Sequence, residues 1–465
     1  MSQPPNPSPS GQHVPTVRPR PGACPQAPGA PSFQSRPRYI DYGRPRAYDT
    51  SVRPATGLTA ARYAPAPIHR PQQAQPQSAW STQTRRVQDV AQEASRLPLG
   101  GILVWLAVVM LGIAMIVVLG YFFLEFVLTA SSSPVWWPVT AFLAFMSLVV
   151  IAGVMVLADR WDPQPLPLVI IAVFWGAAIA AFSSYWINSL NVLVAVTLTG
   201  DDDFAQGFVG PVLSAPLVEE VTKGLGLILL MLLARRYFNG PLDGLIYGAL
   251  IGGGFAFTEN IIYYSRQLES FGVGGMVVLV IIRGVLNIFG HAIYTSMTGV
   301  LMALVARKWG TLLGLLAFIP ALIPGIGLHA AWNLFAGFES LLVLVAMLAI
   351  KAILSLLWLI LIVALVFDES RLTRVRLGDY ANQGWLTHEE VDMLATWKGR
   401  REGKRWAAQL GARPIMKRFI RESADLASVR QRLLADGAHP KVVTIEAYLL
   451  HRLTTNRAEL LQRAA

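Results

Sequence analysis

The chain has 465 residues, of which 54% are hydrophobic and only 14% are charged, with a formal net charge of +11. Soluble domains typically carry roughly 25% charged residues, so this composition excludes a wholly soluble protein and predicts that much of the chain lies in lipid. The single cysteine, Cys24, excludes an intramolecular disulfide framework. The basic ends are typical of cytoplasmic flanks of membrane spans. No folded nucleic-acid-binding motif accompanies them, so no nucleic-acid partner is expected.

Residues 1–97 are predicted to form a disordered, cytoplasmic tail rich in proline and arginine. This segment contains 17 of the 30 prolines in the chain and no lysine, and such a composition buries too little apolar surface to offset the entropy of ordering. It also has no apolar run typical of a cleavable signal peptide. The first membrane span is therefore expected to act as its own membrane signal.

Residues 98–368 are predicted to form a bundle of about eight transmembrane helices. An apolar helix needs about 20 residues to cross a bilayer, and eight runs of about that length follow one another. They lie near residues 101–127, 136–157, 166–194, 210–234, 244–264, 275–305, 311–337 and 341–367. The two prolines in the seventh run, Pro320 and Pro324, are expected to bend or break it.

The charges of the loops predict that both termini are cytoplasmic. With the basic tail inside, every inner loop carries arginine or lysine, whereas the outer loops are neutral, acidic or contain one arginine, as the positive-inside rule requires. The inner-loop residues are Arg160, Arg235, Arg236, Arg307, Lys308, Arg371, Arg374 and Arg376. The acidic outer segment Asp201 to Phe204 is interpreted as a solvated loop.

Residues 369–465 are predicted to form a helical cytoplasmic tail. The sequence "THEE" fits a capping box in which Thr387 is the N-cap and Glu390 stands at the third helical position. Gly399 and Gly437 are interpreted as stops for the helices before them. No catalytic pattern is present in this segment, which is therefore expected to be an appendage near the membrane surface.

Polar residues gather on four consecutive spans, although a charged side chain at mid-bilayer costs roughly 2.5–3.5 kcal/mol. Spans one to three are almost bare. Such groups mark functional sites by default, and their clustering predicts one shared site inside the bundle. The residues are Glu219, Glu220 and Lys223 in span four, Glu259 and Asn260 in span five, Arg283, Asn287 and His291 in span six, and His329 and Asn333 in span seven.

The two adjacent glutamates are expected to have different roles. Neighbouring residues on a helix point about 100° apart, so Glu219 and Glu220 do not both face one spot. Lys223 is within reach of either. One glutamate is therefore expected to pair with Lys223 or Arg283 while the other, with preference for Glu219, contacts water.

Two histidines beside buried carboxylates suit water activation, because such a carboxylate can act as a general base and then as an acid. The same residues could equally hold a divalent metal with a water ligand. No HExxH motif is present, so a metal such as zinc would be bound by residues from several helices.

Two other features of the spans are expected to have structural roles, and one alternative function remains. Lys351 in the eighth span has no carboxylate nearby in sequence, and we expect it to snorkel or to make a helix-packing contact. Gly252, Gly253 and Gly254 are expected to allow close helix contact rather than to bind phosphate. A proton-coupled carrier also uses carboxylates and histidines, but the first spans show no repeat of the polar pattern.

The polar segments resemble the motifs of the PrsW-type intramembrane proteases. "EEVTK" is similar to the EExxK motif of that family, and "FAFTEN", "RGVLNIFGHAIYTSMTG" and "HAAWN" are similar to its later motifs. All four occur in order on successive spans, from about Leu166 to Phe367. The two tails lie outside the resemblance.

The resemblance places the chain in a superfamily with the CAAX-prenyl endopeptidases and the bacteriocin-immunity proteins. It implies hydrolysis of a membrane-anchored protein substrate, such as an anti-sigma factor, in a bacterial plasma membrane. It further implies that Glu219 and Glu220 supply the general base and that Glu259, His291 and His329 complete the water or metal site. Asn333 would stabilise the oxyanion, with Lys223, Asn260 and Arg283 in support. The alternatives are a non-catalytic partner-binding or immunity protein of the same fold, or a proton-coupled carrier.

Overall fold

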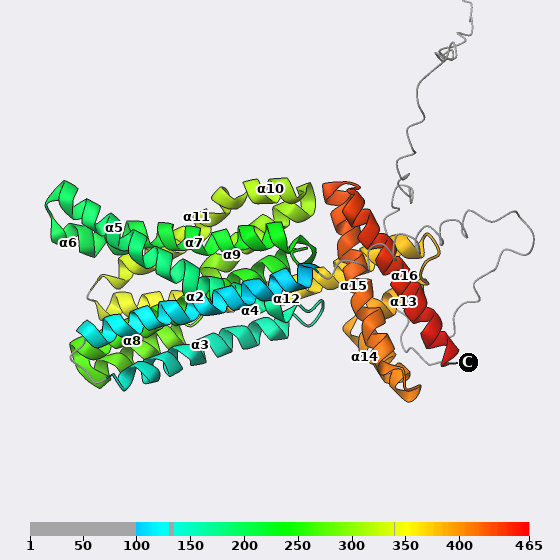
Figure 1. Cartoon of the computed structure of the whole chain (residues 1–465), viewed down its shortest axis with the longest axis horizontal. Helices are drawn as coiled ribbons and strands as arrows, with labels where there is room; N and C mark the ends of the chain where they lie inside the picture. The colour runs from blue at the N-terminus through cyan, green and yellow to red at the C-terminus, as the bar shows by residue number, and fades with distance from the viewer. Residues whose placement is uncertain (1–98, 130–133, 339, 465) are drawn as a thin grey trace, which may run out of the picture. The chain divides into compact units, whose positions relative to one another are not determined.

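The computed structural model describes residues 99–129, 134–338 and 340–464, and all of the regular secondary structure in these ranges is helical. The predicted tail at residues 1–97 lies outside them. Figure 1 shows a bundle of long helices, from which α12 continues into a group of four further helices. The bundle contains α2 (Leu99–Thr129), α3 (Trp136–Ala158), α4 (Leu166–Phe174), α5 (Ala181–Thr199), α6 (Asp202–Phe204), α7 (Ala215–Leu233), α8 (Pro241–Leu279), α9 (Gly290–Trp309), α10 (Thr311–Leu316), α11 (Phe318–Ala336) and α12 (Leu341–Ala381). Three π-helical segments, η2 (Trp175–Ala180), η3 (Ala205–Ser214) and η5 (Val280–Leu286), join some of these, and the 3₁₀ turn η4 (Arg235–Tyr237) follows α7.

The eight predicted spans all fall on helical segments, and six helical stretches of the described residues are long and apolar enough to cross a membrane. The difference has two causes. The fourth predicted span, α7, contains three charged residues and so does not count as apolar. The fifth and sixth lie within a single stretch, Pro241–Trp309. The chain is therefore an all-α polytopic membrane protein.

The stretch Pro241–Trp309 is interrupted at two places. Within α8, Gly272 has a φ of 65° and breaks the helical backbone. Between η5 and α9, a turn at residues 287–289 separates two helical segments. Backbone irregularity at membrane depth is tolerated where it is buried in protein or lines a cavity. The second interruption places His291 in the first turn of α9.

A stripe of glycines on α8 lets this helix pack directly on the backbone of α9. Gly244, Gly248 and Gly252 are spaced four residues apart and therefore share one face. A Cβ added at Gly252 would lie 2.3 Å from the carbonyl oxygen of His291, and one at Gly244 would lie 2.1 Å from that of Gly299. Only glycine permits this approach, as in other small-residue helix contacts in membranes.

The prediction that the glycines after Ile251 serve helix contact is confirmed for two further positions. A Cβ at Gly254 would lie 2.1 Å from the Val173 carbonyl oxygen, and one at Gly253 would lie 3.1 Å from the Ile151 side chain. As a result α8 is buried along most of Pro241–Thr258. It forms the centre of the bundle, against α3, α4 and α9.

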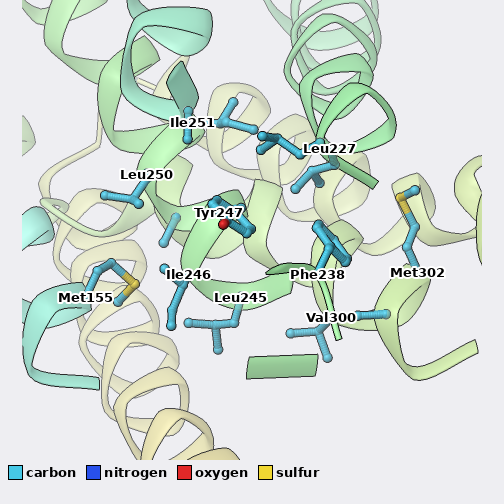
Figure 2. Packing of buried hydrophobic residues seen from close by; sticks show 14 of the residues in the cluster. Met155, Leu227, Phe238, Leu245, Ile246, Tyr247, Leu250, Ile251, Val300 and Met302 are labelled. Carbon is cyan, nitrogen blue, oxygen red and sulfur yellow. The ribbon is translucent and has the colours of Figure 1, made fainter. Parts of the chain in front are cut away.

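The core around α8 is filled by aliphatic and aromatic side chains (Figure 2). Leu245, Ile246, Tyr247, Leu250 and Ile251 on α8 form one buried cluster with side chains from α3, α7 and α9. Close packing of this kind fixes the relative positions of the helices that carry the polar residues.

The seventh span breaks three residues before its first proline. Helix α10 ends at Leu316 and α11 begins at Phe318, so Pro320 falls in the first turn of α11, where a backbone N–H has no helical partner in any case. Pro324 lies inside α11. The break therefore occurs at Ala317 rather than at either proline.

The C-terminal segment is helical, as expected. Beyond the membrane, α12 runs on to Ala381 through the predicted boundary at residue 368, and α13 (His388–Leu394), α14 (Trp397–Gln409), α15 (Arg413–Asp436) and α16 (Pro440–Gln462) follow. The capping box is confirmed, because the Thr387 hydroxyl accepts from the Glu390 N–H and the Glu390 carboxylate accepts from the Thr387 N–H.

Of the two predicted helix stops, one is confirmed and one is wrong. Gly437 follows α15 with a φ of 80°. Gly399 lies inside α14, where its N–H donates to the hydroxyl of the N-cap Thr396. A Cβ there would lie 2.6 Å from the backbone of Met393, so the glycine serves close packing of α13 against α14.

Candidate active site

Three helices bring five of the predicted residues into one buried cluster. Glu219, Glu220 and Lys223 come from α7, His291 from the start of α9 and His329 from α11. Each is less than one tenth exposed, and Lys223 is fully buried. The rings of the two histidines lie 5.1 Å apart, centroid to centroid, and are nearly perpendicular.

Glu220 is held by three hydrogen bonds. Its Oε1 atom lies 2.6 Å from Lys223 Nζ and 3.1 Å from His329 Nδ1, and its Oε2 accepts from the Thr295 hydroxyl at 3.0 Å. Both carboxylate oxygens are therefore occupied. This is the arrangement of a fixed counter-ion for Lys223, which also lies 4.0 Å from the centre of the Phe255 ring.

Glu219 is buried but incompletely satisfied. Its Oε2 atom is shielded from solvent and has no hydrogen-bond partner, although Lys223 Nζ lies at 3.6 Å and His329 Nε2 at 3.8 Å. A buried acceptor without a donor is costly. The atom is therefore available to a donor that enters the site.

The tautomers of the histidines follow from their neighbours. An ammonium group can only donate, so His291 Nδ1, 3.2 Å from Lys223 Nζ, accepts and its Nε2–H donates to Glu259 Oε2 at 2.7 Å. An ionised carboxylate can only accept, so His329 donates from Nδ1 to Glu220. This leaves the His329 Nε2 lone pair unoccupied, 3.8 Å from the free oxygen of Glu219.

Glu259 lies beside the cluster and has a different set of partners. Its Oε2 accepts from Arg283 Nη2 at 2.7 Å as well as from His291. The Arg283 Nε group donates to Asn260 Oδ1 at 3.1 Å. The supporting residues Asn260 and Arg283 thus hold Glu259, which in turn orients His291.

A cavity of about 490 Å³ opens beside Glu219 and Glu259. Glu219 and Glu259 both line it, together with polar side chains of α5 and α8. The remaining polar lining residues are Ser184, Tyr185, Asn188, Ser189, Gln206, Tyr263 and Arg266. The charge pattern gave no sign of this polar wall on α5, because each of its residues is uncharged.

The amide of Asn333 hydrogen-bonds outside the cluster. Its Nδ2 donates to the Pro211 carbonyl at 2.8 Å, which ties α11 to η3. Pro211 lines the cavity, so Asn333 shapes the site through the backbone of η3. This differs from the oxyanion contact that the resemblance implies.

Lys351 makes the packing contact that was one of its two expected roles. It is 4% exposed, donates to the Tyr294 hydroxyl, and lies 4.2 Å from the centre of the Tyr294 ring. Tyr294 stacks on His329 with ring centroids 5.0 Å apart. Nothing in the polar pattern of the sequence pointed to Tyr294, whereas Thr295 could have been found, because it lies four residues after His291 on the same helix face.

Glu219, His291 and His329 are the residues that could offer metal ligands. One atom from each lies within 4.8 Å of the others, and Glu219 stands where the sequence analysis expected Glu259. The arrangement nevertheless does not fit a divalent cation. The Lys223 ammonium lies 3.6 Å from Glu219 Oε2 and 3.2 Å from His291 Nδ1, so a dication would share two ligands with a fixed positive charge.

Fold and site together define a polytopic, all-helical membrane protein with a buried cluster of carboxylates and histidines. Residues 164–366 match the family described as PrsW family intramembrane metalloprotease. The chain is 27% identical over 146 residues to "Protease PrsW" of Bacillus subtilis (strain 168), an alignment that covers 31% of this chain and 58% of that protein. No solved structure matches the chain. Residues 164–366 are thus similar to the PrsW family.

Proposed function

We propose that this protein is an intramembrane protease that hydrolyses a membrane-anchored protein, such as an anti-sigma factor, in a bacterial plasma membrane. The observation that carries the proposal is the Oε2 atom of Glu219, which is buried and has no hydrogen-bond partner. The same residue lines a polar cavity. The match of residues 164–366 to the PrsW family and the similarity to the protease from Bacillus subtilis support the reaction class. The protein is expected to be multi-pass, with both termini in the cytoplasm.

The water site lies between Glu219 and His329. Glu219 Oε2 and His329 Nε2 are both unoccupied acceptors 3.8 Å apart, and one water molecule can donate a hydrogen bond to each. Its lone pair then remains available for attack on a carbonyl carbon. A neutral amide is a poor electrophile, so a water polarised by a general base is needed.

Glu219 acts as the general base in this proposal. It takes a proton from the attacking water as the carbon–oxygen bond forms, and it returns that proton to the leaving nitrogen as the peptide bond breaks. Glu220 remains ionised and holds Lys223, His329 and Thr295 in place. Glu259 orients His291. No step passes through a metal, because the Lys223 ammonium lies 3.6 Å from Glu219 Oε2 and 3.2 Å from His291 Nδ1, where its charge repels a dication.

The test compares membrane proteomes of four otherwise identical strains. They carry the wild-type protein, a deletion, Glu219→Gln, and the control Asp203→Asn, which changes an exposed carboxylate on α6. We expect one membrane-anchored precursor to accumulate in the deletion and Glu219→Gln strains only. Normal processing in the Glu219→Gln strain, with the variant present at wild-type level, would overturn the proposal. Altered solute uptake in that strain would instead indicate a carrier.

A further inference from the structure

One face of α14 rests on the connection between the spans α3 and α4. The Trp397 ring lies 5.0 Å from the Trp161 ring, and Arg400 donates from Nη1 to the Trp161 carbonyl at 2.6 Å. Lys404 lies four residues after Arg400 and seven after Trp397, so it occupies the same face further along the helix. Trp161 belongs to the short segment between two spans and is buried against α14, so this contact lies where the spans leave the bilayer.

The corresponding face of α15 meets the same end of the bundle. Ser428 lines a small cavity with Trp161, and Asp436 accepts from the Thr311 N–H at the start of α10. Arg421 and Lys417 lie seven and eleven residues before Ser428, which places them on this face. Both are exposed, beyond the part of α15 that touches the bundle.

Most of the basic residues in this region have no carboxylate beside them. Lys404, Arg413, Lys417 and Arg421 form no close ion pair with any residue in the described ranges. Of the nearby carboxylates, Glu402 pairs with Lys398 and Glu422 with Arg452, and only Asp425 interacts with one of the four, Arg421. Partial burial and the positive charges of Arg400, Lys417 and Arg413 lower the pKa of Lys404, which shows that the cations lie close together.

We propose that Lys404, Arg413, Lys417 and Arg421, together called the basic face, bind the phosphates of anionic phospholipid headgroups. The leaflet concerned is the one on the side of the C-terminal helices. Two observations favour lipid over a soluble polyanion. The basic face continues the same helix faces that touch the ends of the spans, and the segment between α3 and α4 that α14 contacts lies where two spans leave the bilayer. Clustered lysine and arginine at this level are attracted by the negative surface potential of anionic lipid.

The experiment uses the full-length protein in lipid nanodiscs. Amide hydrogen exchange of residues 397–421 is compared in discs of phosphatidylcholine alone and in discs of phosphatidylcholine mixed with phosphatidylglycerol. Because each surface lysine or arginine adds to the attraction, we expect exchange to be slowed about tenfold in the anionic discs. High salt should remove this difference, since it screens exposed charges.

Two variants of equal charge test whether the basic face is responsible. In the first, Lys404, Arg413, Lys417 and Arg421 are all changed to Gln, and protection by anionic lipid should disappear. In the control, the same change is made at basic residues elsewhere on the C-terminal helices, Lys398, Arg418, Lys441 and Arg463, and protection should remain. Equal exchange in both kinds of disc, or loss of protection in both variants, would overturn the proposal. Stronger protection by an added DNA duplex or polyglutamate than by anionic lipid would also overturn it, in favour of a soluble partner.

Discussion

The Lys223 ammonium and the Glu220 carboxylate lie 2.6 Å apart, and neither side chain is exposed. The two charges are three residues apart on α7, where both are shielded from water. Breaking a buried pair by removing one partner leaves an uncompensated charge, which typically costs 3–5 kcal/mol.

We therefore predict that Lys223→Met lowers the free energy of unfolding by about 3–5 kcal/mol. Thermal unfolding of the purified protein in one detergent measures the loss. The double variant Lys223→Met/Glu220→Gln should recover much of it, because the neutral amide still bonds Thr295 without a buried charge. A single variant as stable as the wild type would contradict this account of the pair.

Gly252→Ala is predicted to destabilise the protein by about 1–3 kcal/mol, the usual cost of overpacking. The new Cβ would lie 2.3 Å from the His291 carbonyl oxygen, so α9 has to move away from α8. Since this movement also disturbs the bond from His291 to Glu259, peptidase activity should fall by more than tenfold. Gly153→Ala is the control, because a Cβ there meets nothing within 4 Å. Equal stability and activity of the two variants would show that the contact is not limiting.

Removal of divalent metal is predicted to leave peptidase activity intact. The Lys223 ammonium occupies the neighbourhood of two of the three possible ligands, so the proposed water activation depends on Glu219 and His329 alone. Elemental analysis of chelator-treated protein, followed by a cleavage assay with the precursor identified in vivo, measures the dependence. Loss of activity that zinc restores would assign the site to a metal and displace the mechanism given above.

The connection between α3 and α4 is predicted to make stability depend on pH. Burial, assisted by the nearby Asp243 charge, raises the pKa of Asp159 to about 7, although its carboxylate accepts from the Gln164 N–H at 2.8 Å. The folded protein therefore retains a proton that the unfolded chain releases near pH 4. The stabilisation of the folded state that comes from retaining this proton is fully present below about pH 4 and is lost as the pH rises to about 7.

Asp159→Asn removes this titration. The unfolding midpoint of the wild type should fall relative to that of the variant between pH 4 and pH 7, and the two curves should run parallel above that window. Curves that run parallel throughout would show that Asp159 titrates normally. The comparison isolates one group, because both proteins share every other carboxylate.

The residue types and spacing were enough to find the elements and most of the site. Hydropathy located the helices, and the clash between lipid and the charges of Glu219, Glu220 and Lys223 identified the helix that carries the proposed base. The pairing of Lys223 with one of two glutamates also followed from helix geometry. The structure distinguishes the two, since Glu220 is satisfied at both oxygens whereas Glu219 is not.

The remaining features depend on contacts between distant segments. Asn333 looked like a site residue because it shares a face with His329, but its amide reaches the Pro211 carbonyl, 122 residues away in sequence. Gly399 looked like the stop of a helix, yet it lies in the first turn of α14, where its N–H donates to the side chain of the N-cap Thr396. Lys351 had no partner within its own span, and only the packing of α12 on α9 supplies one in Tyr294. Spacing along one helix carries no information about such partners.

Helix α12 is one uninterrupted helix of 41 residues from Leu341 to Ala381, which at 1.5 Å per residue is about 60 Å long. Near one end, Lys351 holds the tyrosine that stacks on His329, and near the other, Asp379 receives a hydrogen bond from Arg430 of α15. No turn, glycine break or proline divides the two contacts. A tilt of α12 by the C-terminal helices would therefore also move Lys351, and with it the Tyr294 ring that stacks on His329.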